Sequence, residues 1–257
     1  MNSAPVIEIE HLVMHYGDTV IHEGINLSIQ RGEVFAIAGA SGCGKSTLLR
    51  AIVMLAPVTA GRIRVFGEDI TQLEEAAAQR LRLRCAMMFQ GGALFSGLSV
   101  AENVALPLKE HTQLSAAEIA ELVQIKIAFA GLPADAARKF PRELSGGLRK
   151  RAALARAIAL DPELLFVDEP SAGLDPLAAS ALDTLILNLQ QSLKLTIVIV
   201  THDLDMLWRV TDRVAILGEK RVLEVGSMSA LSASTQPQVR AYFQGPRGRV
   251  IKEQYGS

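Results

Sequence analysis

A glycine-rich segment directly after an apolar run constrains the fold of this chain more than any other feature. Residues 34–38 read Val-Phe-Ala-Ile-Ala, and residues 39–47 read Gly-Ala-Ser-Gly-Cys-Gly-Lys-Ser-Thr. A buried strand, a loop of this pattern and a following helix form a phosphate-binding loop, in which backbone N–H groups and the N-terminus of the helix face an anion. The segment therefore predicts an α/β chain with a strand at 34–38, a helix from residue 45 to about 54, and a nucleotide phosphate site between them.

Several residue types in this loop suit the binding of a nucleotide phosphate. Glycine at Gly44 lets the backbone approach a phosphate group without a Cβ atom in the way. Lys45 supplies a positive charge to the β- and γ-phosphates, and Ser46 offers a hydroxyl to Mg²⁺. An ordinary glycine-rich turn is the alternative, and the preceding strand argues against it. The residues expected to line the site are Gly39, Ser41, Gly42, Cys43, Gly44, Lys45, Ser46 and Thr47.

A second motif is an apolar strand at residues 164–167 that ends in two carboxylates, Asp168 and Glu169. In a phosphate-loop protein the first carboxylate binds Mg²⁺, usually through water. The second carboxylate then lies where it would orient or deprotonate an attacking water molecule. Two solvated loop acids are the alternative interpretation.

The third motif is a second helix N-terminus with little side-chain cover. Ser145 is a favoured helix-capping residue, Gly146 and Gly147 leave the first turn bare, and small or apolar residues follow on one helical face. Such an N-terminus is another potential anion site, although a plain capped helix is equally compatible with the local sequence. The residues of that face are Leu148, Ala152, Ala155 and Ala159.

The remaining pattern is that of an α/β core with a helical insertion. The first third alternates with period two, as in antiparallel strands, and residues 84–89 indicate another strand. Residues 99–160 show helical patterning without a clear strand. Strands and helices then alternate, which implies a parallel sheet: a helix at 177–193, a strand at 196–200, a helix at 204–210, and a hairpin of residues 214–217 and 222–225.

Composition excludes some classes of function. The chain has 257 residues, with 26 basic and 27 acidic side chains, so nothing in its charge favours a nucleic-acid partner. The basic triplets at 80–84 and 149–151 are interpreted as solvated faces. Two distant cysteines lack metal-site spacing and fit a reducing compartment. We expect neither a signal peptide nor a membrane helix, because no apolar run approaches the required length of about 20 residues.

Taken together, the motifs resemble those of ABC-transporter ATPase subunits over about residues 6–230. The phosphate loop resembles the Walker A motif, Asp168 with Glu169 resembles Walker B and the catalytic glutamate, and residues 144–148 resemble the LSGGQ signature. The order of the motifs also matches: Tyr16 at the adenine-stacking position, Gln90 in the Q-loop, Asp175 in the D-loop and His202 in the H-loop. One departure is Leu148 in place of the final glutamine of the signature.

The resemblance implies a P-loop NTPase (RecA-like) core with an antiparallel β subdomain and an inserted α-helical subdomain. The ATPase domain would span residues 6–245, with the core at 6–90 and 160–235, the helical subdomain at about 91–159, and an extended tail at 246–257. It also implies Mg²⁺ bound at Ser46, Gln90 and Asp168, water polarised by Glu169, and a γ-phosphate contacted by His202. Two copies would pair head to tail, and each signature (Ser145, Gly146 and Gly147) would complete the partner's ATP site. Asp175 would then couple the two sites.

A narrower resemblance concerns the segment that follows Gln90. Its Gly-Ala-Leu-Phe, Glu-Asn-Val and Pro-Leu-x-Glu-His-Thr patterns, within residues 92–112, are similar to those of the ATPases of MCE-type (Mla) phospholipid transporters. This implies a peripheral subunit at the cytoplasmic face of the inner membrane. Its expected partners are permease subunits, a periplasmic MCE protein and a small STAS-domain protein, and its cargo is phospholipid. An ATPase of a small-solute importer and a soluble non-transport ABC ATPase are the alternatives.

Overall fold

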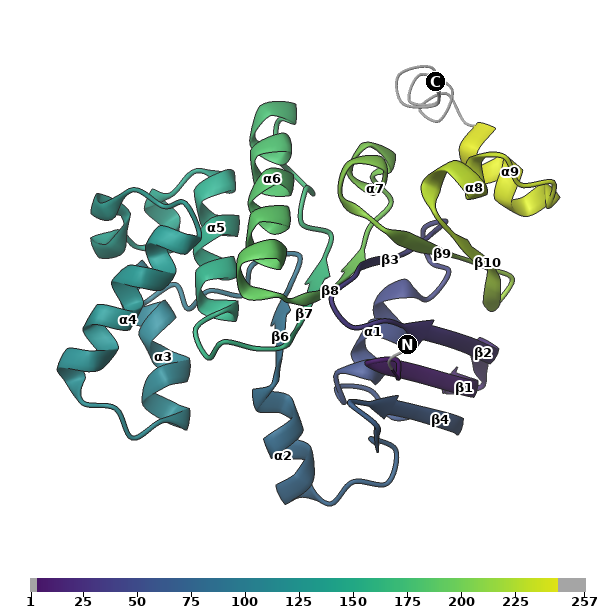
Figure 1. The fold of residues 1–257 in the computed structure, drawn as a ribbon, viewed down its shortest axis with the longest axis horizontal. Helices are drawn as coiled ribbons and strands as arrows, with labels where there is room; N and C mark the ends of the chain where they lie inside the picture. Colours follow the sequence, from purple (N-terminus) through teal and green to yellow (C-terminus); the bar gives the residue numbers. More distant parts are fainter. Residues whose placement is uncertain (1–3, 245–257) are drawn as a thin grey trace. The chain divides into compact units, whose positions relative to one another are not determined.

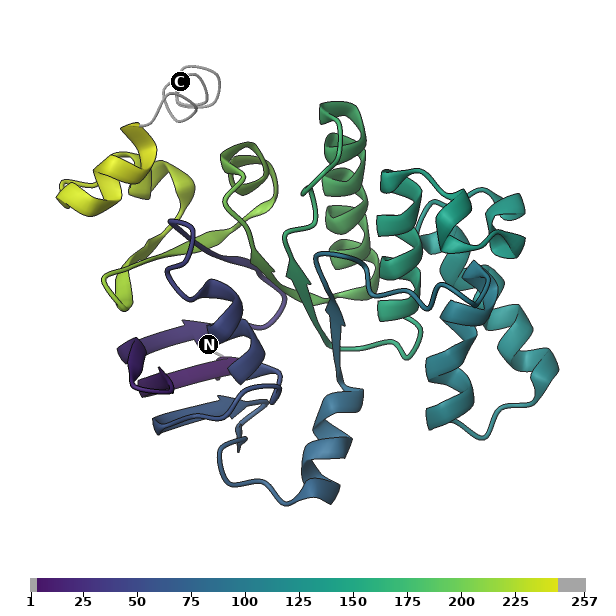
Figure 2. The same cartoon turned by 180° about the vertical axis from the view of Figure 1, so that it is seen from behind.

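The computed structural model describes residues 4–244, which form two compact units. The first unit contains the chain up to Arg82 and again from Thr196 onward. The second unit contains Leu83–Leu195. Both are drawn in Figures 1 and 2.

The first unit contains a four-stranded antiparallel sheet in the order β2-β1-β4-β5. Its strands are β1 (Ile7–Tyr16), β2 (Thr19–Ile29), β4 (Ala60–Val65) and β5 (Glu68–Asp69). Successive side chains of a strand point to opposite faces, so the alternating isoleucines Ile7, Ile9 and Ile63 are all buried on one face. The predicted period-two strands are therefore confirmed.

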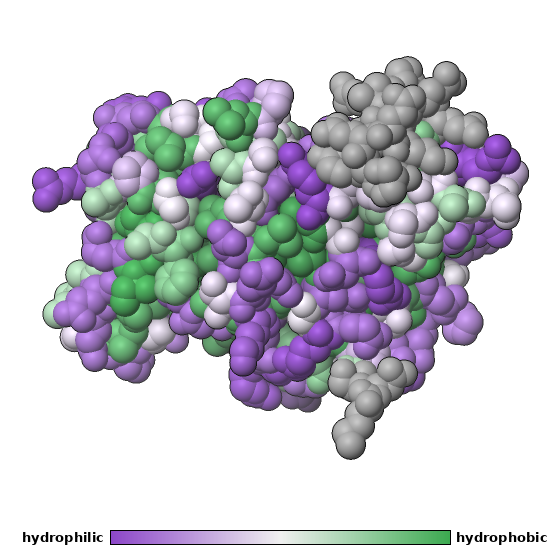
Figure 3. All heavy atoms as spheres, turned by 45° about the horizontal axis from the view of Figure 1, so that its top comes forward, coloured by the Kyte–Doolittle hydropathy of each residue, from purple (hydrophilic) through white to green (hydrophobic). Residues whose placement is uncertain are grey.

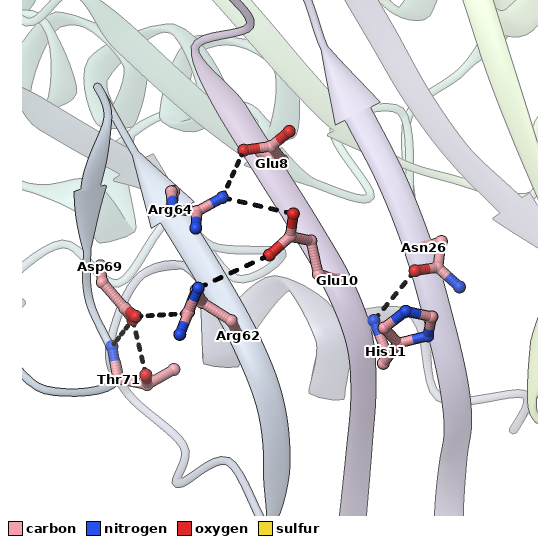
Figure 4. A network of polar contacts seen from close by, with 8 residues as sticks. All are labelled: Glu8, Glu10, His11, Asn26, Arg62, Arg64, Asp69 and Thr71. Carbon is pink, nitrogen blue, oxygen red and sulfur yellow. Dashed lines mark hydrogen bonds and ion pairs between the residues drawn. The ribbon is translucent and has the colours of Figure 1, made fainter.

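Charged residues alternate with these isoleucines and cover the other face of the sheet. Glu8 pairs in register with Arg64, and Glu10 with Arg62. The Arg64 guanidinium lies 2.8 Å from the Glu8 carboxylate, and the Arg62 guanidinium lies 2.8 Å from the carboxylate of Asp69 (Figure 4). These cross-strand ion pairs are largely solvated, so the buried face and not the charged ladder supplies most of the sheet's stability.

The same unit contains a second group of strands around β3 (Val34–Gly39), whose six residues are all buried. Strand β3 pairs in parallel with β8 (Thr196–Val200) and with β9 (Arg213–Gly218). Strand β9 continues into an antiparallel hairpin with β10 (Arg221–Gly226). The helices of this unit are α1 (Lys45–Ile52), α2 (Glu75–Leu83, in this unit up to Arg82), α7 (Leu204–Val210), α8 (Met228–Ser232) and α9 (Pro237–Gln244).

The second unit joins a parallel strand pair to a group of helices. The strands are β6 (Cys85–Met88) and β7 (Leu164–Asp168). The helices are α3 (Val100–His111), α4 (Ala116–Phe129), α5 (Gly146–Ala157) and α6 (Pro176–Leu193), with short 3₁₀ turns at Ala134–Arg138 and Pro141–Glu143. Helices α3, α4 and α5 contact one another around a single apolar cluster, and they lie side by side in Figures 1 and 2.

Serine caps begin the helices of this cluster. Ser99 and Glu102 form a reciprocal capping box at α3, and Ser115 and Glu118 form another at α4. In each box the serine oxygen accepts a backbone N–H while the glutamate accepts the serine N–H, which satisfies two donors that the first turn leaves without a helical partner. Local sequence thus fixes where both helices start.

Most predicted elements are confirmed within one or two residues, including the absence of strands from residues 99–160. Helix α1 ends at Ile52 and not near 54, because Met54 takes a left-handed conformation (φ 59°). Three helices were not predicted: α8, α9 and α2 (Glu75–Leu83). The predicted tail at 246–257 lies outside the described residues.

No helix among residues 4–244 is long and apolar enough to span a membrane. Several large apolar side chains are nevertheless exposed, among them Phe95, Ile125 and Phe129 of the second unit. Figure 3 shows green apolar surface interspersed with purple hydrophilic side chains on the face in view. The positive mean hydropathy of the chain, +0.26, therefore reflects exposed apolar residues as well as its core.

Candidate nucleotide site

The glycine-rich loop follows β3 and leads directly into α1, as predicted. Gly39, Gly42 and Gly44 all have positive φ values, and Gly44 is the N-cap of α1. A Cβ atom on Gly39 would lie 2.3 Å from the carbonyl oxygen of Leu217 and 2.9 Å from the Cys43 sulfur. Only glycine fits this close approach. The loop therefore has the backbone shape in which successive N–H groups face a common anion.

The Lys45 side chain lies along the loop that it is expected to serve. Its Nζ atom donates hydrogen bonds of 2.9 Å to the carbonyl oxygens of Gly39 and Ala40. The side chain is buried, with 8% of the residue exposed. Its ammonium group is thus held at the mouth of the glycine loop, where a point positive charge would meet a phosphate oxygen.

His202 leaves the same sheet edge as the phosphate loop. Strands β3 and β8 are parallel, with Ile37 opposite Val200, so the segments that follow them begin side by side. The backbone N–H of Thr201 donates to the carbonyl oxygen of Ile37, and its hydroxyl accepts the N–H of Asp203. Ligands of open α/β sheets bind at the carboxyl ends of parallel strands, which is where the loop and His202 lie. Tyr16, at the end of β1, is 82% exposed and so is open to stacking.

In the second unit, the parallel pair brings Gln90 and the two carboxylates to one edge. Met88 lies opposite Val167, so Gln90 follows β6 at the edge where Asp168 ends β7 and Glu169 follows it. Asp168 is 8% exposed. Glu169 has a left-handed backbone (φ 46°), which costs roughly 1–2 kcal/mol for a residue other than glycine. Such strain is found where the surrounding structure imposes a required side-chain direction.

Lys150 is the residue that holds the strained backbone of Glu169. Its position shows that the interpretation of residues 149–151 as a solvated face was wrong. The Lys150 side chain is buried, and its Nζ atom donates to the carbonyl oxygens of Gln90 (2.5 Å) and Glu169 (3.2 Å). Burial lowers the pKa of Lys150, and the negative charges of Glu169 and Asp168 oppose that shift. One lysine of α5 thus ties together the two segments that carry the predicted catalytic residues.

Arg156, two turns further along α5, holds the next part of the same loop. Its guanidinium donates to the carbonyl oxygens of Ala93 (2.8 Å) and Gly92 (3.2 Å) and lies 5.9 Å from the centre of the Phe95 ring. Our sequence reasoning missed both basic residues, because it followed a single apolar face of this helix. The small residue Ala153, which lies against Gly92, was the available signal for a second buried face.

The signature segment begins α5 with the predicted cap. The Ser145 hydroxyl accepts the N–H of Leu148 at 3.3 Å. A Cβ on Gly146 would be in van der Waals contact with Leu174, so the bare first turn packs beside the segment that holds Asp175. Asp175 caps α6 by accepting the N–H of Ala178 at 2.9 Å. The second unit therefore brings the signature and the D-loop together, with the N–H groups of Gly146 and Gly147 at a helix N-terminus.

The residues expected to hold Mg²⁺ offer oxygen donors of several kinds. Within residues 4–244, no group of three or more His, Cys, Asp and Glu side chains could hold a metal ion. Ser46, Gln90 and Asp168 offer a hydroxyl, an amide and a carboxylate oxygen, which are the ligand types that Mg²⁺ prefers. Because Mg²⁺ usually completes its shell with waters and phosphate oxygens, these few protein ligands fit it.

Comparison with known proteins gives the family. The family described as "ABC transporter" matches residues 22–172. The "Intermembrane phospholipid transport system ATP-binding protein MlaF" of Escherichia coli K12 is 40% identical over 94% of this chain and 90% of its own length. The protein of the same name from Haemophilus influenzae is 38% identical over 97% and 94%. The "Probable ribonucleotide transport ATP-binding protein mkl" of Mycobacterium tuberculosis is 38% identical, over 94% of this chain and 67% of that protein.

Solved structures of ATP-binding cassettes resemble this chain as well. The dimeric ATP-binding cassette MJ0796 in a post-hydrolysis state with ADP and Pi is 28% identical, with a TM-score of 0.78 over 86% of this chain and 98% of that one. Clostridium perfringens cbiO1, part of the transporter complex cbiONQ, is 31% identical, with a TM-score of 0.83 over 97% and 100%. The chain has the P-loop NTPase fold and belongs to the ABC transporter family, as one of its ATP-binding, ATP-hydrolysing subunits.

Proposed function

We propose that this chain is the ATPase motor of an ABC transporter that moves phospholipid between the inner and outer membranes and so maintains outer-membrane lipid asymmetry. The observation that carries this proposal is the similarity to two proteins named as phospholipid-transport ATP-binding subunits, along almost the whole of both chains. The residue patterns that follow Gln90 point the same way. Transport of a small solute remains the competing function, and the mycobacterial relative is named for a nucleotide cargo.

In the proposed reaction, the phosphate loop binds the phosphates of ATP and Tyr16 stacks on its adenine. Lys45 neutralises the β- and γ-phosphates, and Ser46, Gln90 and Asp168 hold Mg²⁺. When bound there, Mg²⁺ would supply positive charge to offset the charge that develops on the phosphate oxygens. Glu169 accepts a proton from, or orients, the water that attacks the γ-phosphorus, and His202 contacts the γ-phosphate. Lys150 positions the Glu169 backbone for this task through its hydrogen bond to the Glu169 carbonyl oxygen.

The active form is proposed to be a head-to-tail dimer. Helix N-termini favour anions, and the Ser145 hydroxyl with the Gly146 and Gly147 N–H groups would bind the γ-phosphate held by a second copy. Asp175 lies next to the signature and would link the two sites. ATP then joins the subunits, hydrolysis separates them, and the cycle is a shift between closed and open populations. The MJ0796 cassette, which is described as dimeric, supports the pairing of two copies by analogy.

The proposed partners are two permease subunits, a periplasmic MCE protein and a small STAS-domain protein, with the chain bound peripherally at the cytoplasmic face of the inner membrane. Exposed Phe95, in the segment that follows Gln90, offers apolar surface for a permease. The chain's balanced charge does not favour a nucleic-acid partner.

The test is affinity purification of the tagged full-length chain from its native membranes in mild detergent, followed by mass spectrometry of proteins and lipids. A permease with an MCE protein, a STAS protein and bound phospholipid supports the proposal. A permease with a solute-binding protein would identify a solute importer. Soluble partners alone would refute a transport function.

A further inference from the structure

His22 is a buried histidine that none of the roles above uses. It lies on β2 opposite Met14, is fully buried, and its Nε2 atom is 3.0 Å from the carbonyl oxygen of Gly44 in the phosphate loop. A carbonyl oxygen only accepts hydrogen bonds, so Nε2 carries the proton and donates it. An imidazole of the antiparallel sheet therefore bonds directly to the backbone of the nucleotide loop.

The second ring nitrogen, Nδ1, indicates that His22 does not stabilise the fold as well as an apolar side chain would. Burial lowers the pKa of His22, which favours the neutral ring, in which Nδ1 is an unprotonated acceptor. Nδ1 is buried and has no hydrogen-bond partner among the described residues. A buried acceptor without a partner destabilises a folded protein, whereas an apolar side chain of similar size would leave none. What the ring gains at this position is the bond to Gly44.

The contact between His22 and Gly44 is also close, and it leaves no room for a side chain at position 44. Gly44 has a φ of 93°, and a Cβ atom placed on it would lie 2.6 Å from Cε1 of His22 and 2.8 Å from Cγ2 of Ile21. Strand β2 thus presses against the loop at a position where glycine is required. The loop cannot move toward the ring, and the hydrogen bond keeps it from moving away.

The consequence follows from the geometry of one peptide unit. The Gly44 carbonyl and the Lys45 N–H belong to the same planar trans peptide and point in opposite directions. The carbonyl also accepts the N–H of Leu48 at 2.9 Å. The Lys45 N–H is at the first helical position and has no intrahelical acceptor, so it points out of the helix end toward the anion site. Holding the carbonyl therefore aims this N–H, and a donor on the carbonyl polarises it further.

We propose that His22 is a positioning residue of the nucleotide site, which holds the Gly44–Lys45 peptide from behind so that its N–H faces a nucleotide phosphate. The inference rests on the proposed nucleotide site. It assigns to the antiparallel subdomain a part in phosphate binding in addition to the adenine contact proposed for Tyr16.

Methionine and glutamine at position 22 form a matched pair, since both are unbranched and of similar size but only glutamine has a distal N–H donor. Binding of MgADP to the full-length chain is measured by calorimetry, and steady-state ATP turnover is measured with the same proteins. We expect His22→Met to raise the MgADP Kd about fivefold, the factor that a typical net hydrogen bond represents. The ATP KM should rise by a similar factor with kcat within about twofold, and His22→Gln should bind nearly as the wild type does.

The controls separate positioning from packing and from the proposed function. His111→Met, at an exposed histidine of the second unit, should leave the MgADP Kd unchanged. Wild-type affinity in His22→Met would overturn the inference, because the donor would then be dispensable. Equal weakening in both variants at position 22 would also overturn it, because the ring shape and not the donor would matter. Failure of the wild-type chain to bind MgADP would refute the nucleotide site itself.

Discussion

Replacing Lys150 by methionine tests whether the buried lysine of α5 holds the catalytic segment. The change removes two hydrogen bonds from a charged donor, to the carbonyl oxygens of Gln90 and Glu169. Each such bond contributes about 1.5–3 kcal/mol when its acceptor stays buried. Against this, methionine avoids the free-energy cost of burying an ammonium group, a cost that is visible in the lowered pKa of Lys150. We expect a net loss of about 3 kcal/mol in the free energy of unfolding.

The effect on turnover should be larger than the effect on nucleotide affinity. Without Lys150 the strained backbone of Glu169 is free to relax, and a displacement of about 1 Å at a catalytic group costs about 100-fold in rate. Nucleotide affinity should change less, because Lys45 is held along the phosphate loop by hydrogen bonds to Gly39 and Ala40 that do not involve Lys150. Thermal unfolding should show a Tm lower by about 6–12 °C, from about 2–4 °C per kcal/mol for a chain of this size.

Two variants control the experiment. Lys150→Arg keeps a cationic donor and should retain most of the turnover. Arg149→Met removes an exposed neighbouring charge and should behave as the wild type does. ATP turnover at the wild-type rate in Lys150→Met would refute the argument that this lysine positions Glu169.

Four further outcomes are expected. Glu169→Gln should bind ATP and accumulate as a dimer in gel filtration while its turnover falls at least about 100-fold, and normal hydrolysis would contradict the assignment of the base. Gly44→Ala should lose MgADP binding in calorimetry, because the new Cβ would overlap His22 at 2.6 Å. Asn103→Ala should lower the free energy of unfolding in urea by about 3 kcal/mol, since the buried amide bonds the backbone of Phe95, Leu98 and Ser99. Burial raises the pKa of Cys85 to about 12, so mass spectrometry should find it unmodified by iodoacetamide at pH 8, where fewer than about 1 in 1,000 of its thiols are ionised.

Periodicity and short motifs predicted the elements and the site segments, because these are local properties of the chain. The loop after β3, the carboxylates after β7 and the cap at Ser145 each depend on residues that are neighbours in sequence. The parallel pairings then follow from the alternation of strands and helices. The side chains that support the site could not be found this way, because Lys150 and His22 bond to residues that are 60 and 22 positions away.

Lys150 also shows why composition misled the sequence reasoning. Three adjacent basic residues usually mark a solvated surface, since lysine and arginine are rarely buried without a partner. In this chain the partners are backbone carbonyl oxygens, which no sequence pattern reveals. Helix α5 is buried on two faces. It therefore places Lys150 in the interior and leaves the neighbouring Arg149 exposed.

Leu148, the departure from the family's signature, has a physical explanation in the same helix. Its side chain packs against the apolar cluster of the second unit, while its N–H donates to the Ser145 cap. What the Ser145 cap uses from this residue is its backbone N–H, which leucine supplies as well as glutamine would. The anion site that we propose for the signature would use the serine hydroxyl and the N–H groups of two glycines, and none of these depends on the side chain at position 148. Leucine at this position is thus compatible with the phosphate contact that we propose for the signature, and its apolar packing holds the first turn of α5 to the helices behind it.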